Sequence, residues 1–156
     1  MSPTTSSDAA QDRRQRWLSV LAKAPADRLE ALWQALGPVP AYTVLRRPEI
    51  GLAMVRGRIS GSGAPFAAGE MTVTRAAVRL ATGELGIGYV GGRHAQQAER
   101  IAALDALGQT EAWRQRIEDA VVAPCAEEAE ARRRLRAAKA AATKVDFFTV
   151  AREAGT

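Results

Sequence analysis

The stretch FAAGEMTVTRAAVRLATGELGIGYVGG, residues 66–92, decides the fold class. Residues 66–80 predict a long strand, because apolar side chains recur at every second position. The apolar face changes near Thr74 and Arg75, which indicates a bulge or a twist there. Thr82-Gly83 predicts a tight turn, and residues 84–90 predict the returning strand. An antiparallel sheet is therefore expected in the middle of the chain.

Upstream of this stretch, the chain predicts two more strands. Residues 41–46 predict a short strand, Pro48-Glu49 predicts a turn, and residues 50–60 predict a second strand. A flexible loop follows at residues 61–65, where glycine, serine and proline are concentrated. The complete sheet is therefore expected to contain about four strands.

Two helices are predicted before the sheet. Residues 1–11 are polar and are expected to be disordered, and residues 12–23 predict a first helix. A second helix is predicted from Pro25 to Gly37, because its apolar side chains repeat at helical spacing. The side chains that form this stripe are Leu29, Leu32, Trp33 and Leu36. Together the two segments predict an N-terminal helix pair.

The chain after the sheet predicts helices again. One helix is expected from Arg93-His94 to Gly108, with a continuation that ends at Pro124. Residues 126–143 predict a last helix, rich in alanine, glutamate and arginine, and an extended tail follows it. The sequence thus predicts an α+β protein with a single domain over residues 1–156.

Composition and charge restrict the functions that are open to this chain. It has 156 residues, a formal net charge of +5 and a sequence pI near 10.1, which favours partners that are polyanions. A basic module that binds nucleic acid or nucleotides is therefore one candidate function. No stretch is apolar enough to cross a membrane, and residues 1–12 lack a secretory signal, so a cytoplasmic location is expected.

The sequence does not contain a recognisable set of catalytic residues. His94 is the single histidine and Cys125 the single cysteine, so metal ligands at the usual spacing are missing. No Gly-x-Ser-x-Gly elbow, Walker A loop or dinucleotide fingerprint occurs. Catalytic residues are therefore left unassigned, and we expect neither a metal nor a cofactor on this chain alone.

One local pattern predicts a site for anions. Gly91, Gly92 and Arg93 lie where a strand leads into a helix, and helix N-termini with nearby glycines bind phosphate groups. In the expected hairpin, Arg75 lies opposite Val90 and Arg79 opposite Gly86, so both arginines are candidates for gripping a triphosphate or phosphonate. The alternative is that these arginines are solvated charges or salt-bridge partners between subunits.

The C-terminal segment, residues 124–156, predicts a docking element. Leu135 is the only large apolar residue of its helix, so this helix can bury little surface against its own domain. The tail nevertheless carries Val145, Phe147 and Phe148, which favours docking onto a partner chain. The alternative is that the two phenylalanines fold back onto the sheet.

Three stretches of the chain resemble one known family. They are GEMTVTRAAVRL at residues 69–80, GGR followed by AER and LDAL between residues 91 and 107, and KVDFFTV at residues 144–150. Together they are similar to the PhnG subunit of the bacterial carbon–phosphorus lyase complex. Relatives tend to read Gly-Arg-Asp and then His-Ala-Glu where this chain has Gly92-Arg93-His94 and Gln97-Ala98-Glu99. His94 therefore stands where relatives have the aspartate, and Gln97 stands where they have the histidine. The resemblance does not extend to these two positions.

This resemblance implies a role in phosphonate catabolism in the cytoplasm. It implies a multi-subunit assembly with the I subunit especially, and with the H, J, K and L subunits, without membrane or nucleic acid. The assembly displaces adenine from ATP by methylphosphonate and forms α-D-ribose 1-methylphosphonate 5-triphosphate. ATP is then a substrate of the complex, and this chain is not expected to be catalytic alone.

Overall fold

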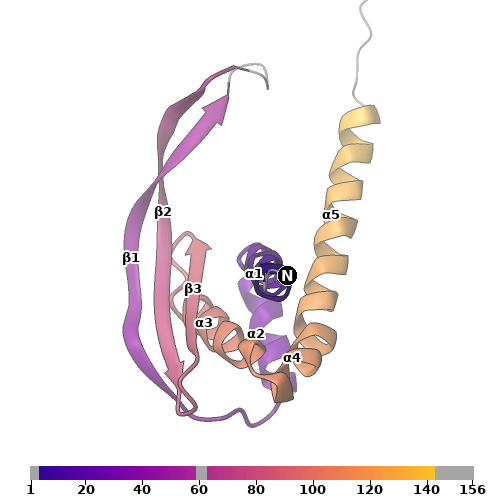
Figure 1. The fold of residues 1–156 in the computed structure, drawn as a ribbon. Coiled ribbons are helices and arrows are strands. Elements are labelled where there is room, and N and C mark those ends of the chain that lie inside the picture. The colour runs from indigo at the N-terminus through magenta and orange to yellow at the C-terminus, as the bar shows by residue number, and fades with distance from the viewer. Residues whose placement is uncertain (1–3, 59–62, 143–156) are drawn as a thin grey trace, which may run out of the picture.

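A computed structural model describes residues 4–58 and 63–142 of the chain. The elements in chain order are α1 (Thr4–Leu21), α2 (Ala26–Ala35), β1 (Tyr42–Arg58), β2 (Pro65–Leu80), β3 (Leu85–Gly91), α3 (Ala95–Gln109), α4 (Glu111–Ile117), the π-helical segment η1 (Glu118–Val122) and α5 (Ala123–Ala142). Figure 1 shows the sheet on one side with α3 against it, α5 farthest from the sheet, and α1 and α2 between α3 and α5. This arrangement confirms the expected α+β class, with its N-terminal helix pair and C-terminal helices.

The sheet of the described residues has three antiparallel strands in the order β1-β2-β3, so the expectation of about four strands is corrected. The predicted strands at 41–46 and 50–60 are a single strand, β1, and the predicted turn at Pro48-Glu49 lies inside it. A proline is tolerated there because β1 is an edge strand and its register shifts between Arg46 and Glu49.

The turn between β2 and β3 is one residue longer than predicted. Leu80 N donates to Glu84 O at 3.0 Å, and Gly83 adopts a φ of 109°, which glycine reaches without strain. This longer turn moves the register by one residue, so Arg75 lies opposite Tyr89 and Arg79 opposite Leu85. The predicted opposition to Val90 and Gly86 was therefore wrong.

The bulge predicted near Thr74-Arg75 lies on the neighbouring strand: the register shifts between Arg46 and Glu49 of β1, which pair with Ala77 and Arg75, while β2 pairs with β3 without a shift. The apolar residues of β2 also change face here, because two environments meet near this position. Ala76, Val78 and Leu80 are buried against the helices, whereas Met71 lies beyond the end of β3 and is exposed. The pattern thus marks the place where the covered part of β2 ends.

The hydrophobic core is centred on α3, whose residues 101–107 are all buried. A helix that is buried on all sides needs neighbours on all sides, and here the sheet covers one side while α1 and α2 cover another. Two glycines of β3 allow α3 to approach the sheet closely. A Cβ on Gly88 would lie 1.8 Å from Ala98 O, and one on Gly86 would lie 1.9 Å from Ala102 O.

The predicted start of the first helix and the predicted helix end at Pro124 were both wrong. The first helix already begins at Thr4, so residues 4–11, which were expected to be disordered, are helical. Ala9, Ala10 and Gln11 favour a helix, and no glycine or proline interrupts it.

Pro124 does not end the helix before it, because helical structure continues from Glu111 to Ala142. Proline lacks a backbone N–H and clashes with the carbonyl one turn earlier. The wider π-helical turn of η1 comes directly before Pro124, where such a turn relieves that clash.

Candidate functional site

The most exposed apolar surface is the outer part of the β1–β2 hairpin. We call residues 52–58 of β1 and 65–72 of β2 the distal hairpin, because they pair with each other beyond the last residue of β3. Figure 1 shows that this hairpin extends past β3 and α3. Its exposed large side chains are Leu52, Met54, Val55, Phe66 and Met71, and Leu52 keeps 67% of its surface.

Such a two-stranded hairpin is only marginally stable in water by itself. In addition, the edge of β2 that carries β3 at Val73–Arg79 has no described strand beside residues 65–71. Exposed apolar side chains and an open strand edge are features of surfaces that bind other polypeptides. The distal hairpin is therefore the first candidate for an interface.

Helix α5 is the second exposed element. Its only buried residue is Cys125, and the described residues after Arg132 are all exposed, including Leu135 at 57%. This agrees with the prediction that Leu135 finds little to pack against in its own domain. The docking residues Val145, Phe147 and Phe148 lie outside the described residues, so docking through them stays a prediction.

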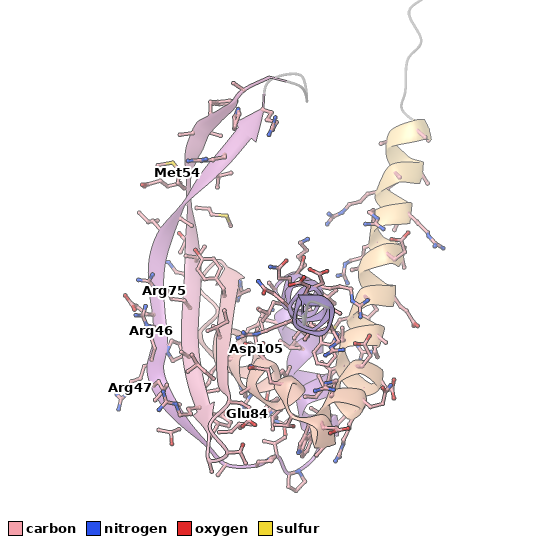
Figure 2. All side chains as sticks on the ribbon, in the orientation of Figure 1. Arg46, Arg47, Met54, Arg75, Glu84 and Asp105 are labelled. Carbon is pink, nitrogen blue, oxygen red and sulfur yellow. The ribbon has the colours of Figure 1, made fainter. Side chains whose placement is uncertain are left out.

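The structure separates the arginines that were expected to hold an anion. Arg75 lies on the sheet face that points away from the helices, together with Arg46 and Arg47 (Figure 2). Its Nη2 lies 3.2 Å from Glu49 Oε1, so a carboxylate of the same domain already pairs with it. Arg79 is exposed near the β2–β3 turn, opposite Leu85.

Arg93 lies elsewhere, two residues before α3 begins at Ala95. It lines a hollow of about 250 Å³ together with residues of α2 and α3, including Glu30 and Arg100. Arg93 is thus on the helix side of the sheet, while Arg75 is on the opposite side. Anion binding by Arg75, Arg79, Gly91, Gly92 and Arg93 stays a prediction, but the five residues do not form one cluster.

The Gly91-Gly92 turn is held by a side chain that the sequence did not single out. Thr74 is fully buried, its Oγ1 donates to Gly92 O at 2.7 Å, and it accepts a hydrogen bond from His94 N at 3.0 Å. Gly92 has a φ of 89°, which explains the glycine at this position. A threonine inside an apolar strand was the only sequence signal for this contact.

Asp105 was also missed, although it is buried in the centre of the molecule (Figure 2). Its carboxylate accepts hydrogen bonds from Arg14 Nε and Nη2 and from Ile87 N, each at 2.8 Å. The hydrogen bond with Asp105 raises the pKa of Arg14 above its ordinary value. Asp105 thereby joins α1, β3 and α3 through hydrogen bonds, which is a structural role.

The remaining candidates for chemistry lack suitable partners. His94 is exposed and forms no ion pair with a carboxylate of residues 4–58 and 63–142. Cys125 is buried, and this burial raises the pKa of its thiol, so the reactive thiolate is disfavoured. Within the same residues, no group of three His, Cys, Asp or Glu side chains is placed to hold a metal ion.

None of the described helices is both long and apolar enough to cross a membrane. Catalytic residues remain unassigned in the part of the chain that the structure describes. The exposed hairpin and α5 instead point to contacts with other polypeptides.

Comparison with known proteins agrees with the family resemblance. The family model described as phosphonate metabolism protein PhnG matches residues 12–153. A relative from Rhizobium meliloti (strain 1021), described as α-D-ribose 1-methylphosphonate 5-triphosphate synthase subunit PhnG, is 43% identical over 148 residues. This match covers 95% of the chain and 94% of the relative. The chain therefore belongs to the PhnG family of phosphonate metabolism proteins.

Proposed function

We propose that this chain is the G subunit of an α-D-ribose 1-methylphosphonate 5-triphosphate synthase and acts in phosphonate catabolism. In this role it supports the displacement of adenine from ATP by methylphosphonate, and ATP is a substrate of the assembly. Its partners are the other subunits of the carbon–phosphorus lyase complex, the I subunit especially, with H, J, K and L. The proposal places the assembly in the cytoplasm.

The distal hairpin is the observation that carries this proposal. Leu52, Met54 and Phe66 expose apolar surface on an element that no helix of the described chain covers. Burial is worth about 25 cal/mol per Å² of apolar surface, so covering this hairpin with a partner would stabilise the complex considerably. An enzyme that works alone gains nothing from leaving such a surface in water.

The proposal is tested by co-expressing the chain with the other subunits. We expect the purified complex to release adenine from ATP and methylphosphonate, and this chain alone to release none. Adenine release by the isolated chain would overturn the assignment to a supporting subunit.

A triple variant tests the hairpin directly. Leu52→Ser, Met54→Ser and Phe66→Ser together should leave circular dichroism unchanged and greatly reduce recovery of the chain in the complex. The matched control changes Leu45, Leu85 and Ile87 to serine, because these side chains are similarly exposed but lie outside the distal hairpin. Equal recovery of the two triple variants would remove the support that the hairpin gives.

The alternative of a nucleic-acid module receives less support. It needs a continuous positive surface with exposed aromatic side chains. The densest arginine run, at residues 132–134, is paired with Glu128 and Glu130 on the same helix. A salt-sensitive gel shift with random DNA at physiological ionic strength would favour the alternative.

A further inference from the structure

A groove between α1 and α5 has a charge imbalance that nothing described so far explains. Its volume is about 720 Å³, and both helices contribute to its lining. Val20, Ala126 and Ala129 are among the small or apolar residues of this lining. The charged side chains that line it are Arg16, Lys23, Arg132, Arg133, Arg136 and Glu130. Five cations thus face one carboxylate.

The neighbouring carboxylates compensate for only part of this charge. Arg133 pairs with Glu130, whereas Arg16 lies 3.7 Å from Glu118 and Arg132 lies 3.9 Å from Glu128, at the outer limit for an ion pair. Lys23 and Arg136 have no carboxylate within ion-pair distance among residues 4–58 and 63–142. Cations gathered along a groove repel one another and raise the local positive potential, which favours an anionic occupant.

The spacing of the cations favours an extended occupant. Arg132 and Arg136 are one helical turn apart on α5, and Arg16 and Lys23 are seven residues apart on α1. Seven residues of a helix cover about 10 Å, so positive side chains line the groove along about two helical turns. A segment of polypeptide with several aspartates and glutamates meets such a distribution, because its carboxylates are spread along its length.

A nucleotide fits this groove less well. Bases are usually held by stacking on aromatic side chains, and the lining contains no aromatic residue. A triphosphate also concentrates its charge at one end, whereas the cations here are distributed along two helices. The same comparison disfavours single-stranded nucleic acid.

We propose that the groove between α1 and α5 binds an acidic segment of another subunit of the synthase. This inference rests on the proposed function, because it takes the partner from the same assembly. The pairing is electrostatic and would act together with the distal hairpin, which offers apolar surface at a different place on the chain.

Charge reversal tests the inference in the full-length chain. Lys23→Glu combined with Arg136→Glu reverses the two cations whose loss leaves no carboxylate unpaired. The matched control is Arg13→Glu combined with Arg47→Glu, which changes the net charge equally on two arginines that lie outside the groove and have no ion pair to a described residue. With the other subunits co-expressed, we expect the groove variant to bind about tenfold more weakly and the control to bind as the unchanged chain does.

Salt provides a second readout of the same contact. Raising the ionic strength should weaken assembly of the unchanged chain and affect the groove variant much less, because screening acts on the charges that were removed. Equal recovery of the groove variant and the control at every salt concentration would overturn the inference. Circular dichroism of each variant verifies that the fold is retained.

A photo-cross-link identifies the occupant. With p-benzoylphenylalanine in place of Arg133, the cross-linked peptide should come from another subunit and be rich in aspartate and glutamate. A basic or apolar peptide, or no cross-link to another subunit, would overturn the inference. Loss of the cross-link on addition of ATP would assign the groove to the nucleotide instead, which also overturns it.

The controls separate this inference from the proposed function. If the unchanged chain does not assemble with the other subunits, the proposed function fails. If the unchanged chain and the groove variant assemble equally well, only the groove loses its role.

Discussion

The surroundings of α3 and the distal hairpin contain similar residues in opposite environments. Leu104 is completely buried between the sheet and the N-terminal helices, whereas Leu52 is 67% exposed on the hairpin. The first region obtains its stability from packing inside the chain. The second region keeps its shape through hydrogen bonds between two strands and leaves its apolar surface uncovered. The comparison indicates that the first region serves folding, whereas the second is the surface that the proposed function assigns to assembly.

The largest expected effect comes from the contact between β3 and α3. Gly88→Ala would place a Cβ 1.8 Å from Ala98 O, and backbone atoms on both sides cannot move away easily. We expect a loss of unfolding free energy of about 4 kcal/mol or more, measured by urea denaturation. The control is Gly51→Ala, since a Cβ there meets nothing within 4 Å. Similar losses for both variants would contradict the packing described for β3.

The second-largest effect is expected when Leu104 in the core is truncated, and the same truncation of Leu52 on the hairpin serves as the comparison. Leu104→Ala should cost about 3 kcal/mol because it opens a cavity in the core. Leu52→Ala should change the unfolding free energy of the isolated chain by less than about 0.5 kcal/mol, because exposed side chains contribute little. Urea denaturation of both variants tests this. A large loss from Leu52→Ala would mean that the hairpin packs inside the chain after all.

A smaller effect is expected from the polar contact inside the core. Asp105→Ala leaves Ile87 N without its acceptor and Arg14 without its partner. Because Arg14 is 39% exposed and regains water, we expect a loss of about 2 kcal/mol rather than the cost of a fully buried pair. Glu118→Ala removes its partly exposed pair with Arg16, at 3.7 Å, and should cost about 0.5 kcal/mol or less in the same measurement.

The smallest expected effect is on how the stability of the fold depends on pH in the acidic range. Hydrogen bonds from Arg100 and then Gln34 lower the pKa of Glu30 below its ordinary value of 4.5. The stabilisation is therefore complete above the ordinary pKa and is lost as pH falls through the lowered value. Glu30→Gln should flatten the pH dependence of the melting temperature in this acidic range. An unchanged acid profile would show that this ion pair contributes nothing to stability.

The helices and the central hairpin could be predicted because local patterns determine them. Leu29, Leu32, Trp33 and Leu36 form an apolar stripe, and all four are buried in the core. The hairpin of β2 and β3 was predicted from alternating apolar residues and a glycine turn. Its register was wrong by one residue, because turn length depends on backbone geometry that Thr82-Gly83 alone does not determine.

The candidate site was harder to predict because it depends on contacts between distant segments. Asp105 meets Arg14 across 91 positions of sequence, and Thr74 meets Gly92 and His94 across the sheet. The basic groove joins α1 to α5, so neither helix displays it alone. Exposure of the distal hairpin was also hidden, since its alternating apolar residues are typical of a strand covered on one face.

The close contact of β3 with α3 has a consequence for how this family can diverge. Gly86 and Gly88 leave room only for the backbone of α3 and for the small side chain of Ala106. A larger residue on either element would require a compensating change on the other. We therefore expect substitutions to covary between homologues at positions 86, 88, 98, 102 and 106. Neighbouring positions on the outer sheet face should change independently of them.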